Sequence, residues 1–116
     1  MDVIEFYTGS WIGDDGAGVR RVLAPEIEVD WNLDAPVDDE ELLQTLHRIA
    51  AFADSVTITS MVRGADGAAL VYDLVAPFGT VLLAEFLTVR DGRISEIRQV
   101  YDVVAVDRFF PGLYQN

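Results

Sequence analysis

The chain has 116 residues, 51% of them hydrophobic, and carries 20 acidic side chains against eight basic ones, a formal net charge of −12. A chain of this length predicts one domain, 1–116, and the negative charge opposes binding to nucleic acid or to anionic membranes. The sequence has no cysteine, no lysine and one histidine, His47, which excludes thiol chemistry, lysine Schiff bases and multi-histidine metal centres.

The start of the chain predicts two short helices. Asp2 and Glu5 have the spacing of a capping box, and the apolar side chains that follow recur at helical intervals as far as Gly13. Asp14 or Asp15 can cap the second helix. Met1 and Asp2 are followed by acidic and aromatic residues rather than by the basic start of a signal peptide, so we expect a cytoplasmic protein.

The remaining sequence predicts one strand, a third helix and then only strands. Residues 26–32 alternate in the manner of a strand, and the acidic segment 38–41 opens a helix that continues to Ala53. Four further strands are predicted at residues 55–63, 68–76, 80–90 and 93–105. This order favours an α+β fold in which three helices pack on one face of a curved antiparallel sheet.

The stretch 68–89 is long and apolar enough to cross a bilayer, but it contains Asp73 and Glu85. Two carboxylates and the central Pro77-Phe78-Gly79 favour two strands joined by a turn, so we expect no membrane span. Strand parity, with a loop at 78–80, predicts that Asp73 and Glu85 lie on the same apolar face and share a proton. The alternative is a pair of buried acids neutralised by an arginine such as Arg98.

Three segments resemble the nuclear transport factor 2-like fold, and within it the SnoaL-like proteins, which are related to ketosteroid isomerases, polyketide cyclases and limonene-epoxide hydrolases. The segments are "FYTGSWIGDDGAGVRRVLAPEIEVDW", "LVYDLVAP" and "AEFLTVRDGRISEIRQVYD". The resemblance implies a conical pocket between helices and sheet, an apolar small-molecule ligand, a homodimer, and neither a metal nor a cofactor.

The catalytic sets of these relatives are only partly present. By the resemblance, the tyrosine of ketosteroid isomerases falls at Phe6, their base near Trp31 with Asp30 one residue away, and their hydrogen-bond-donating acid at Glu85. The Arg and two Asp residues of limonene-epoxide hydrolases fall at Asp73, Val75 and Gln99.

A turn at Asp91-Gly92 decides which side chains of the last strand join Glu85. A two-residue turn places Arg98 opposite Glu85, whereas a bulge places Ile97, Gln99 and Tyr101 on its face, and the resemblance favours the bulge. We therefore expect a catalytic set of Asp73, Glu85, Gln99 and Tyr101 and a set of substrate-binding residues. The substrate-binding residues are Phe6, Trp11, Trp31, Ile49, Leu83, Leu87 and Ile97.

The predicted function is proton transfer on an apolar cyclic molecule, as an isomerase or cyclase. In this hypothesis Asp73 is the base and protonated Glu85 donates to an enolate oxygen. An epoxide hydrolase and a binding protein without catalysis remain alternatives. His47 lies off the apolar helix stripe, and we expect it to be exposed.

Two further features bear on partners. The face opposite Glu85, with Tyr72, Leu82, Ala84 and Phe86, is also apolar and is expected to form a homodimer interface. The aromatic tail 108–114 can close the pocket or reach a partner subunit.

Overall fold

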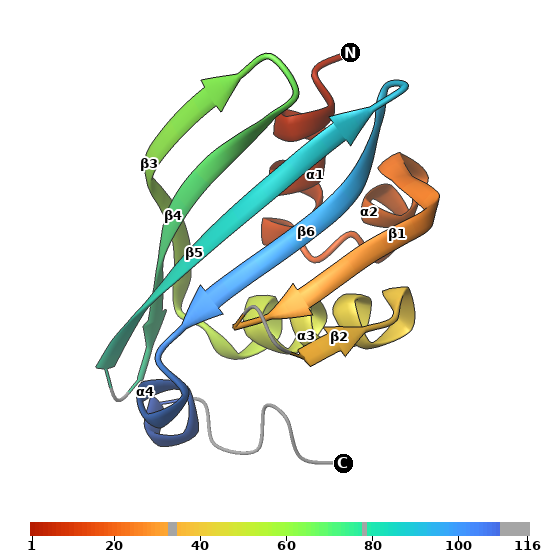
Figure 1. The fold of residues 1–116 in the computed structure, drawn as a ribbon. Helices are drawn as coiled ribbons and strands as arrows, with labels where there is room; N and C mark the ends of the chain where they lie inside the picture. Colours follow the sequence, from red (N-terminus) through yellow and green to blue (C-terminus); the bar gives the residue numbers. More distant parts are fainter. Residues whose placement is uncertain (33–34, 78, 110–116) are drawn as a thin grey trace.

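The computed structural model describes residues 1–32, 35–77 and 79–109, and in this part of the chain it contains four helices and a six-stranded sheet (Figure 1). The helices are α1 (Val3–Ile12), α2 (Gly16–Val22), α3 (Asp39–Phe52) and α4 (Val103–Phe109). The strands are β1 (Leu23–Trp31), β2 (Ala35–Val37), β3 (Ser55–Gly64), β4 (Gly67–Ala76), β5 (Gly79–Arg90) and β6 (Arg93–Tyr101).

The sheet has the strand order β2-β1-β6-β5-β4-β3, and α1, α2 and α3 cover one of its faces (Figure 1). The predicted α+β fold is therefore confirmed. The expectation of a purely antiparallel sheet is wrong, because β1 runs parallel to β6. Strands β2 and β3 both run opposite to β1, and the three antiparallel pairings from β3 to β6 then bring β6 into the direction of β1.

The predicted helix starts are confirmed by their caps. The side chains of Asp2, Asp15 and Asp38 accept hydrogen bonds from the backbone N–H groups of Glu5, Gly18 and Glu41. Each bond satisfies one of the free N–H groups in the first turn of a helix.

The hairpin between β4 and β5 differs from the prediction by one residue. Ala76 pairs with Gly79, so two residues separate the paired strands instead of the three expected at 78–80. Relative to the prediction, the partner of Asp73 moves by three residues, from Glu85 to Leu82, and a shift by an odd number of residues moves side chains to the other face. Leu70 consequently pairs with Glu85, and Asp73 pairs with Leu82.

The hairpin between β5 and β6 has the expected strand pairing, but the bulge that produces it lies in β6 and not in the turn. Arg90 pairs with Arg93, so the turn consists of two residues. The register then shifts between the pairs Thr88–Glu96 and Val89–Ile94, which leaves Ser95 as an extra residue in β6.

This bulge places Gln99 opposite Glu85, Ile97 opposite Leu87 and Tyr101 opposite Leu83. The prediction that these three side chains of β6 share the face of Glu85 is confirmed.

The predicted strand 93–105 is too long. Strand β6 ends at Tyr101, and the side chain of Asp102 accepts hydrogen bonds from the backbone N–H groups of Val104 and Ala105 at the start of α4. The tail predicted at 108–114 lies mostly outside the described residues.

The core fills the space between the helices and the inner face of the sheet. The fully buried side chains Tyr7 and Trp11 from α1, Leu42 from α3 and Tyr72 from β4 belong to it. In the described part of the chain, the helices are too short or too polar to cross a membrane.

Candidate functional site

Glu85 lies at the centre of the inner sheet face and is completely buried, with 0% of its surface exposed. Three side chains donate hydrogen bonds to its carboxyl group. The Tyr72 hydroxyl donates to Oε1 at 2.7 Å, while the Tyr7 hydroxyl and the Gln99 amide donate to Oε2 at 2.7 and 2.8 Å. We call Glu85 and these three donors the Glu85 cluster. Its donors are uncharged, so among the described residues a carboxylate here has hydrogen bonds but no counterion.

Three separate elements hold the Glu85 cluster together. Gln99 lies directly opposite Glu85 on β6, and Tyr72 is a diagonal neighbour on β4, within the reach of an aromatic side chain. Tyr7 reaches down from α1, one helical turn before Trp11. The indole of Trp11 packs edge-on against the ring of Tyr72, with 5.1 Å between ring centroids. The helix layer and the sheet therefore meet at this carboxyl group.

Burial and hydrogen bonding act in opposite directions on Glu85. Burial raises the pKa of its carboxyl group, while the bonds from Tyr72, Gln99 and Tyr7 lower it, and the balance lies above the ordinary value of 4.5. Burial, together with the nearby charge of Glu85, raises the pKa of Tyr7 and of Tyr72. Both phenols are therefore held in their protonated, hydrogen-bond-donating form.

Asp73 does not join the Glu85 cluster, and the prediction that the two carboxyl groups share a face is wrong. Asp73 pairs with Leu82 and Thr57 on the outer face, because the β4–β5 hairpin is one residue tighter than expected. A proton shared by Asp73 and Glu85 is excluded by this register. The pair of acids that an epoxide hydrolase would need is likewise divided between the two faces.

The alternative, an ion pair between Glu85 and Arg98, is also wrong. Arg98 lies opposite Phe86 on the outer face, and its Nε is 3.4 Å from Oδ2 of Asp30. The Ser95 bulge keeps Arg98 away from Glu85. Asp30, the acid near the expected base position, forms this ion pair with Arg98 on the outer face and does not contact the Glu85 cluster.

Two tyrosines of the cluster were missed by the sequence reasoning. Phe6 was matched to the helix tyrosine of ketosteroid isomerases, but Tyr7, the next residue, contacts Glu85, and the ring of Phe6 lies 6.0 Å from the guanidinium carbon of Arg21. Tyr72 was assigned to the outer face by the same register error that misplaced Asp73. The helical spacing of Val3, Tyr7 and Trp11 was a signal that could have identified Tyr7.

The other expected site residues lie either in the buried core or at its edge. The side chains of Trp11, Ile49, Leu83, Leu87 and Ile97 are buried in the core. Tyr101 and Trp31 are half-buried, and Trp31 pairs with Gln99 across the parallel strands, so both extend the inner face beyond the cluster. His47 is exposed, as expected, and its Nδ1 lies 2.7 Å from Oδ1 of Asp14.

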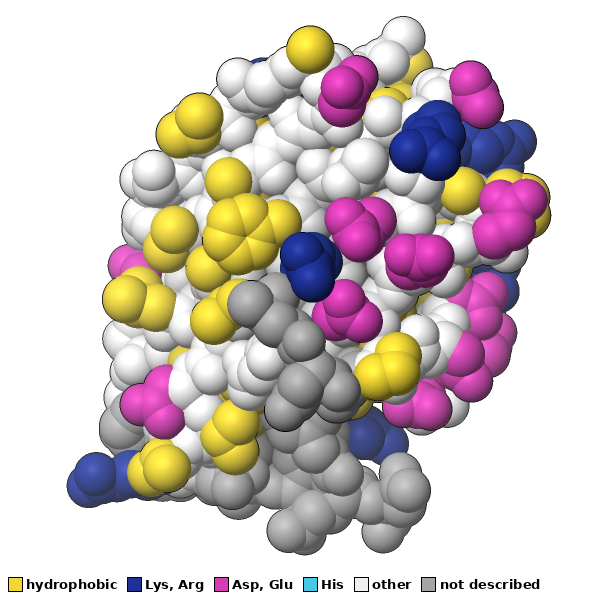
Figure 2. Space-filling view, in the orientation of Figure 1, with side chains coloured by type: hydrophobic (Ala, Val, Ile, Leu, Met, Phe, Trp, Pro, Cys, Tyr) yellow, Lys and Arg dark blue, Asp and Glu magenta, His cyan; other side chains and the backbone are white. Residues whose placement is uncertain are grey.

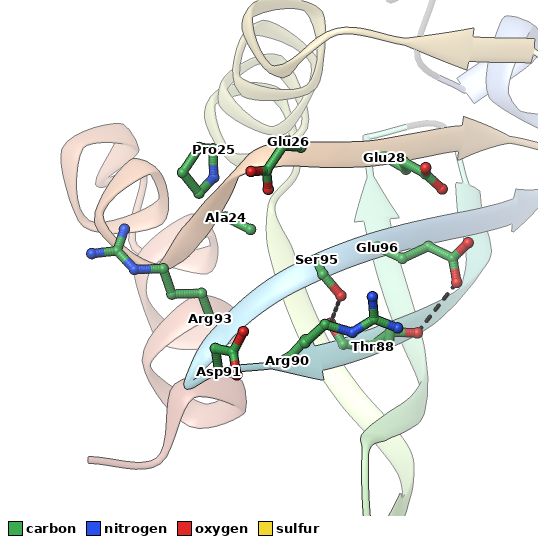
Figure 3. A pocket seen from close by; sticks show the side chains of 10 residues that line it. All are labelled: Ala24, Pro25, Glu26, Glu28, Thr88, Arg90, Asp91, Arg93, Ser95 and Glu96. Carbon is green, nitrogen blue, oxygen red and sulfur yellow. Dashed lines mark hydrogen bonds between the residues drawn. The ribbon is translucent and has the colours of Figure 1, made fainter.

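A polar groove of about 470 Å³ lies on the outer face of the sheet, where β1, β5 and β6 run side by side (Figure 3). Glu28 and Glu96 face it, and the Thr88 hydroxyl donates to Glu96 at 3.2 Å. Among the described residues no group of three or more His, Asp or Glu side chains is arranged to hold a metal ion. The Glu85 cluster on the inner face therefore remains the candidate functional site.

No protein-family model matches the chain, and no curated protein matches its sequence. Solved structures match its fold closely. A protein from Kribbella flavida is similar with a TM-score of 0.81 at 23% identity, over 99% of this chain and 96% of its own. A nuclear transport factor 2-like protein from Cytophaga hutchinsonii is similar with a TM-score of 0.73 at 10% identity, over 90% and 91%.

A steroid delta-isomerase from Pseudomonas aeruginosa is also similar, with a TM-score of 0.78 at 12% identity, over 96% of this chain and 85% of its own. The chain therefore has the nuclear transport factor 2-like fold that its sequence predicted. At these identities the likeness concerns the fold, and one fold supports many functions.

Proposed function

We propose that this protein binds an apolar cyclic molecule and catalyses proton transfer on it, as an isomerase or cyclase, with Glu85 as the group that takes up and returns the proton. The observation that carries the proposal is a fully buried carboxyl group with three uncharged donors and a raised pKa. Catalytic acids and bases are commonly tuned in this way by burial. The likeness to a steroid delta-isomerase supports the reaction class by analogy.

The hydrogen bonds suggest how one carboxyl group can serve the whole reaction. Oε1 accepts a single bond, from Tyr72, and keeps a lone pair for a proton from a carbon next to a carbonyl group. When that C–H bond breaks and the carboxylate becomes an acid, its charge disappears and it holds its donors less strongly. The hydroxyls of Tyr72 and Tyr7 can then turn to the enolate oxygen formed on the substrate. Glu85 returns the proton to a second carbon and recovers its three hydrogen bonds.

Substrate must enter the core for this reaction, because Glu85 has no exposed surface in the unliganded chain. The apolar walls around the Glu85 cluster, among them Leu83, Leu87 and Ile97, favour an uncharged ligand. The net charge of −12 also disfavours an anionic one.

The test is deuterium exchange at carbons next to the carbonyl group of uncharged cyclic ketones, including a steroid ketone, followed by NMR in heavy water. We expect the protein to accelerate exchange and Glu85→Gln to abolish the acceleration. Asp73→Asn is the matched control, because it removes a carboxylate from the outer face, and it should retain the activity. Saturable binding without exchange would instead identify a binding protein. An equal loss of exchange activity in Glu85→Gln and Asp73→Asn would show that the activity does not depend on the Glu85 cluster.

We also propose that two copies associate through the outer face of the sheet. Leu82 and Phe86 are 61% and 44% exposed there. In Figure 2, apolar side chains gather on this face over β3, β4 and β5. Asp73 is half-buried on the same face, and no hydrogen bond or ion pair joins its carboxyl group to another side chain in the described part of the chain. A partner subunit would cover the apolar surface and supply a donor to Asp73. Tyr72, which was expected in this interface, lies on the inner face instead.

A further inference from the structure

The indole N–H of Trp11 is a buried hydrogen-bond donor without an acceptor. Trp11 is 1% exposed, and its Nε1 forms no hydrogen bond with any other group in the described part of the chain. A buried N–H that gives up water without gaining an acceptor destabilises the fold, and such groups are rare in native proteins. A bound molecule that brings an oxygen to this N–H would supply the missing acceptor.

Trp11 lies beside the tyrosine that donates to Oε1 of Glu85. Its indole packs edge-on against the ring of Tyr72, with 5.1 Å between ring centroids, and the Tyr72 hydroxyl donates to Oε1 at 2.7 Å. Burial raises the pKa of Tyr72, as does the neighbouring Glu85, whereas the Trp11 indole opposes this rise. A donor has that effect only from close to the phenol oxygen. The indole N–H therefore lies near the hydroxyl end of the Tyr72 ring.

The other donors of the site are occupied while Glu85 is a carboxylate. Tyr72, Tyr7 and Gln99 all donate to its two oxygens, so a ketone that enters at this stage finds these three donors in use. The Trp11 N–H is not in use. The carbonyl oxygen of a ketone is two bonds away from the carbon that loses a proton, so its donor must lie close to Oε1. Trp11, next to Tyr72, meets this requirement.

We propose that the indole N–H of Trp11 donates a hydrogen bond to the carbonyl oxygen of the ligand, next to the Tyr72 hydroxyl. The inference rests on the proposed function for the class of ligand, an uncharged cyclic ketone that enters the core.

The proposed bond also acts during proton transfer. When the C–H bond breaks, the proton passes to Oε1 of Glu85 and the electron pair passes into the carbonyl group, which becomes an enolate. The indole keeps its own proton, because its nitrogen is only a donor. Its bond to the oxygen strengthens as negative charge develops there, so it stabilises the enolate more than the ketone. Tyr72 then turns to the same oxygen as a second donor.

The test compares 2-tetralone, an uncharged cyclic ketone, with tetralin, which has the same carbon skeleton without the oxygen. The indole N–H proton of Trp11 is followed in ¹H–¹⁵N NMR spectra and is assigned by its loss in Trp11→Phe or by its persistence in Trp31→Phe. We expect 2-tetralone to move this proton downfield in a saturable way, as formation of a hydrogen bond does, and tetralin to cause no downfield shift. No saturable shift with 2-tetralone, or an equal shift with tetralin, would overturn the proposal.

The variant Trp11→Phe separates the N–H from the packing of the ring. It keeps an aromatic ring beside Tyr72 but removes the donor. In protein that circular dichroism shows to be folded, we expect 2-tetralone to bind up to about tenfold more weakly and tetralin to bind equally well. The kcat of deuterium exchange into 2-tetralone should fall at least about tenfold. Equal weakening of 2-tetralone and tetralin would show that Trp11 acts by packing alone and would contradict the proposal.

Failure of this inference differs from failure of the proposed function. Exchange that the wild type accelerates without a shift of the Trp11 proton would overturn the role of Trp11 and leave Glu85 as the group that carries the proton. A saturable downfield shift with 2-tetralone but without exchange would support the Trp11 donor and contradict the proposed catalysis.

Discussion

Tyr72 on β4 and Glu85 on β5 are diagonal neighbours on the inner face of the sheet, and the Tyr72 hydroxyl donates to Oε1 of Glu85 at 2.7 Å. This contact exists only because Leu70, and not Val71, stands opposite Glu85. A register shifted by one residue would turn Tyr72 to the outer face and bring Val71 and Asp73 to the inner one. The pairing of β4 with β5 therefore decides whether Glu85 faces hydroxyl donors or a second negative charge.

The first prediction concerns the loss of stability when the three donors of the Glu85 cluster lose their acceptor. Glu85→Leu leaves Tyr7, Tyr72 and Gln99 buried without their acceptor, and each unsatisfied group costs about 1–3 kcal/mol. Glu85→Gln keeps the shape and one accepting oxygen. We expect Glu85→Leu to lose several kcal/mol of unfolding free energy in urea at neutral pH, and Glu85→Gln to lose much less. Comparable stability of the two variants would mean that the donors find other partners.

The second prediction concerns the dependence of stability on pH. Because the pKa of Glu85 is raised in the folded state, the folded protein holds this proton more tightly than the unfolded chain does. The unfolding free energy of the wild type, minus that of Glu85→Gln, should therefore fall as pH rises above about 4.5, by at most about 1.4 kcal/mol per pH unit, and level off above the folded-state pKa.

Urea denaturation of both proteins across pH 4–9 measures this difference. The subtraction removes the contribution of the other acidic residues, since the two chains differ at one position. A difference that grows with rising pH would show that the hydrogen bonds outweigh burial.

The third prediction separates the Glu85 cluster from the ion pair on the outer face. Arg98 and Asp30 keep 43% and 28% of their side-chain surface exposed, and such pairs contribute about 0–1 kcal/mol. Arg98→Met retains the aliphatic stem and should change the unfolding free energy by less than about 1 kcal/mol. A loss of several kcal/mol would mean that Arg98 compensates a buried charge after all.

The fourth prediction tests the proposed dimer. Leu82→Glu and Phe86→Glu place charges at the centre of the outer face and should convert a dimer to a monomer in size-exclusion chromatography with light scattering. Val104→Glu introduces the same charge at a 74% exposed position on α4 and serves as the control. A wild type that is monomeric at micromolar concentration would contradict the interface.

Much of the fold could be predicted from local patterns in the sequence. Caps at Asp2, Asp15 and Asp38 identify the helix starts, because an acidic side chain there satisfies free N–H groups. Helix α4 was missed because residues 103–105 read as a continuation of a β-rich strand. Their helical start depends on Asp102, whose side chain binds the N–H groups of the first turn.

The site was less predictable, because it depends on long-range pairing. Glu85, Gln99 and a position on the first helix were identified, but the donors Tyr7 and Tyr72 were not. Each was missed by a single residue, in the alignment of α1 or in the length of one hairpin. Both faces of β4 and β5 are apolar, so hydrophobic alternation could not correct the register.

The carboxyl titration of Glu85 tests most directly the claim that Glu85 is tuned to exchange a proton. The measurement is an NMR titration of the side-chain carboxyl carbon, assigned by its loss in Glu85→Gln, in the wild type and in Tyr72→Phe. We expect a titration midpoint above 4.5 in the wild type and a higher one in Tyr72→Phe, because removal of a hydrogen-bond donor leaves the effect of burial on the pKa less opposed. A midpoint at or below 4.5 in both proteins would contradict this claim and leave Glu85 as a permanently ionised structural anchor.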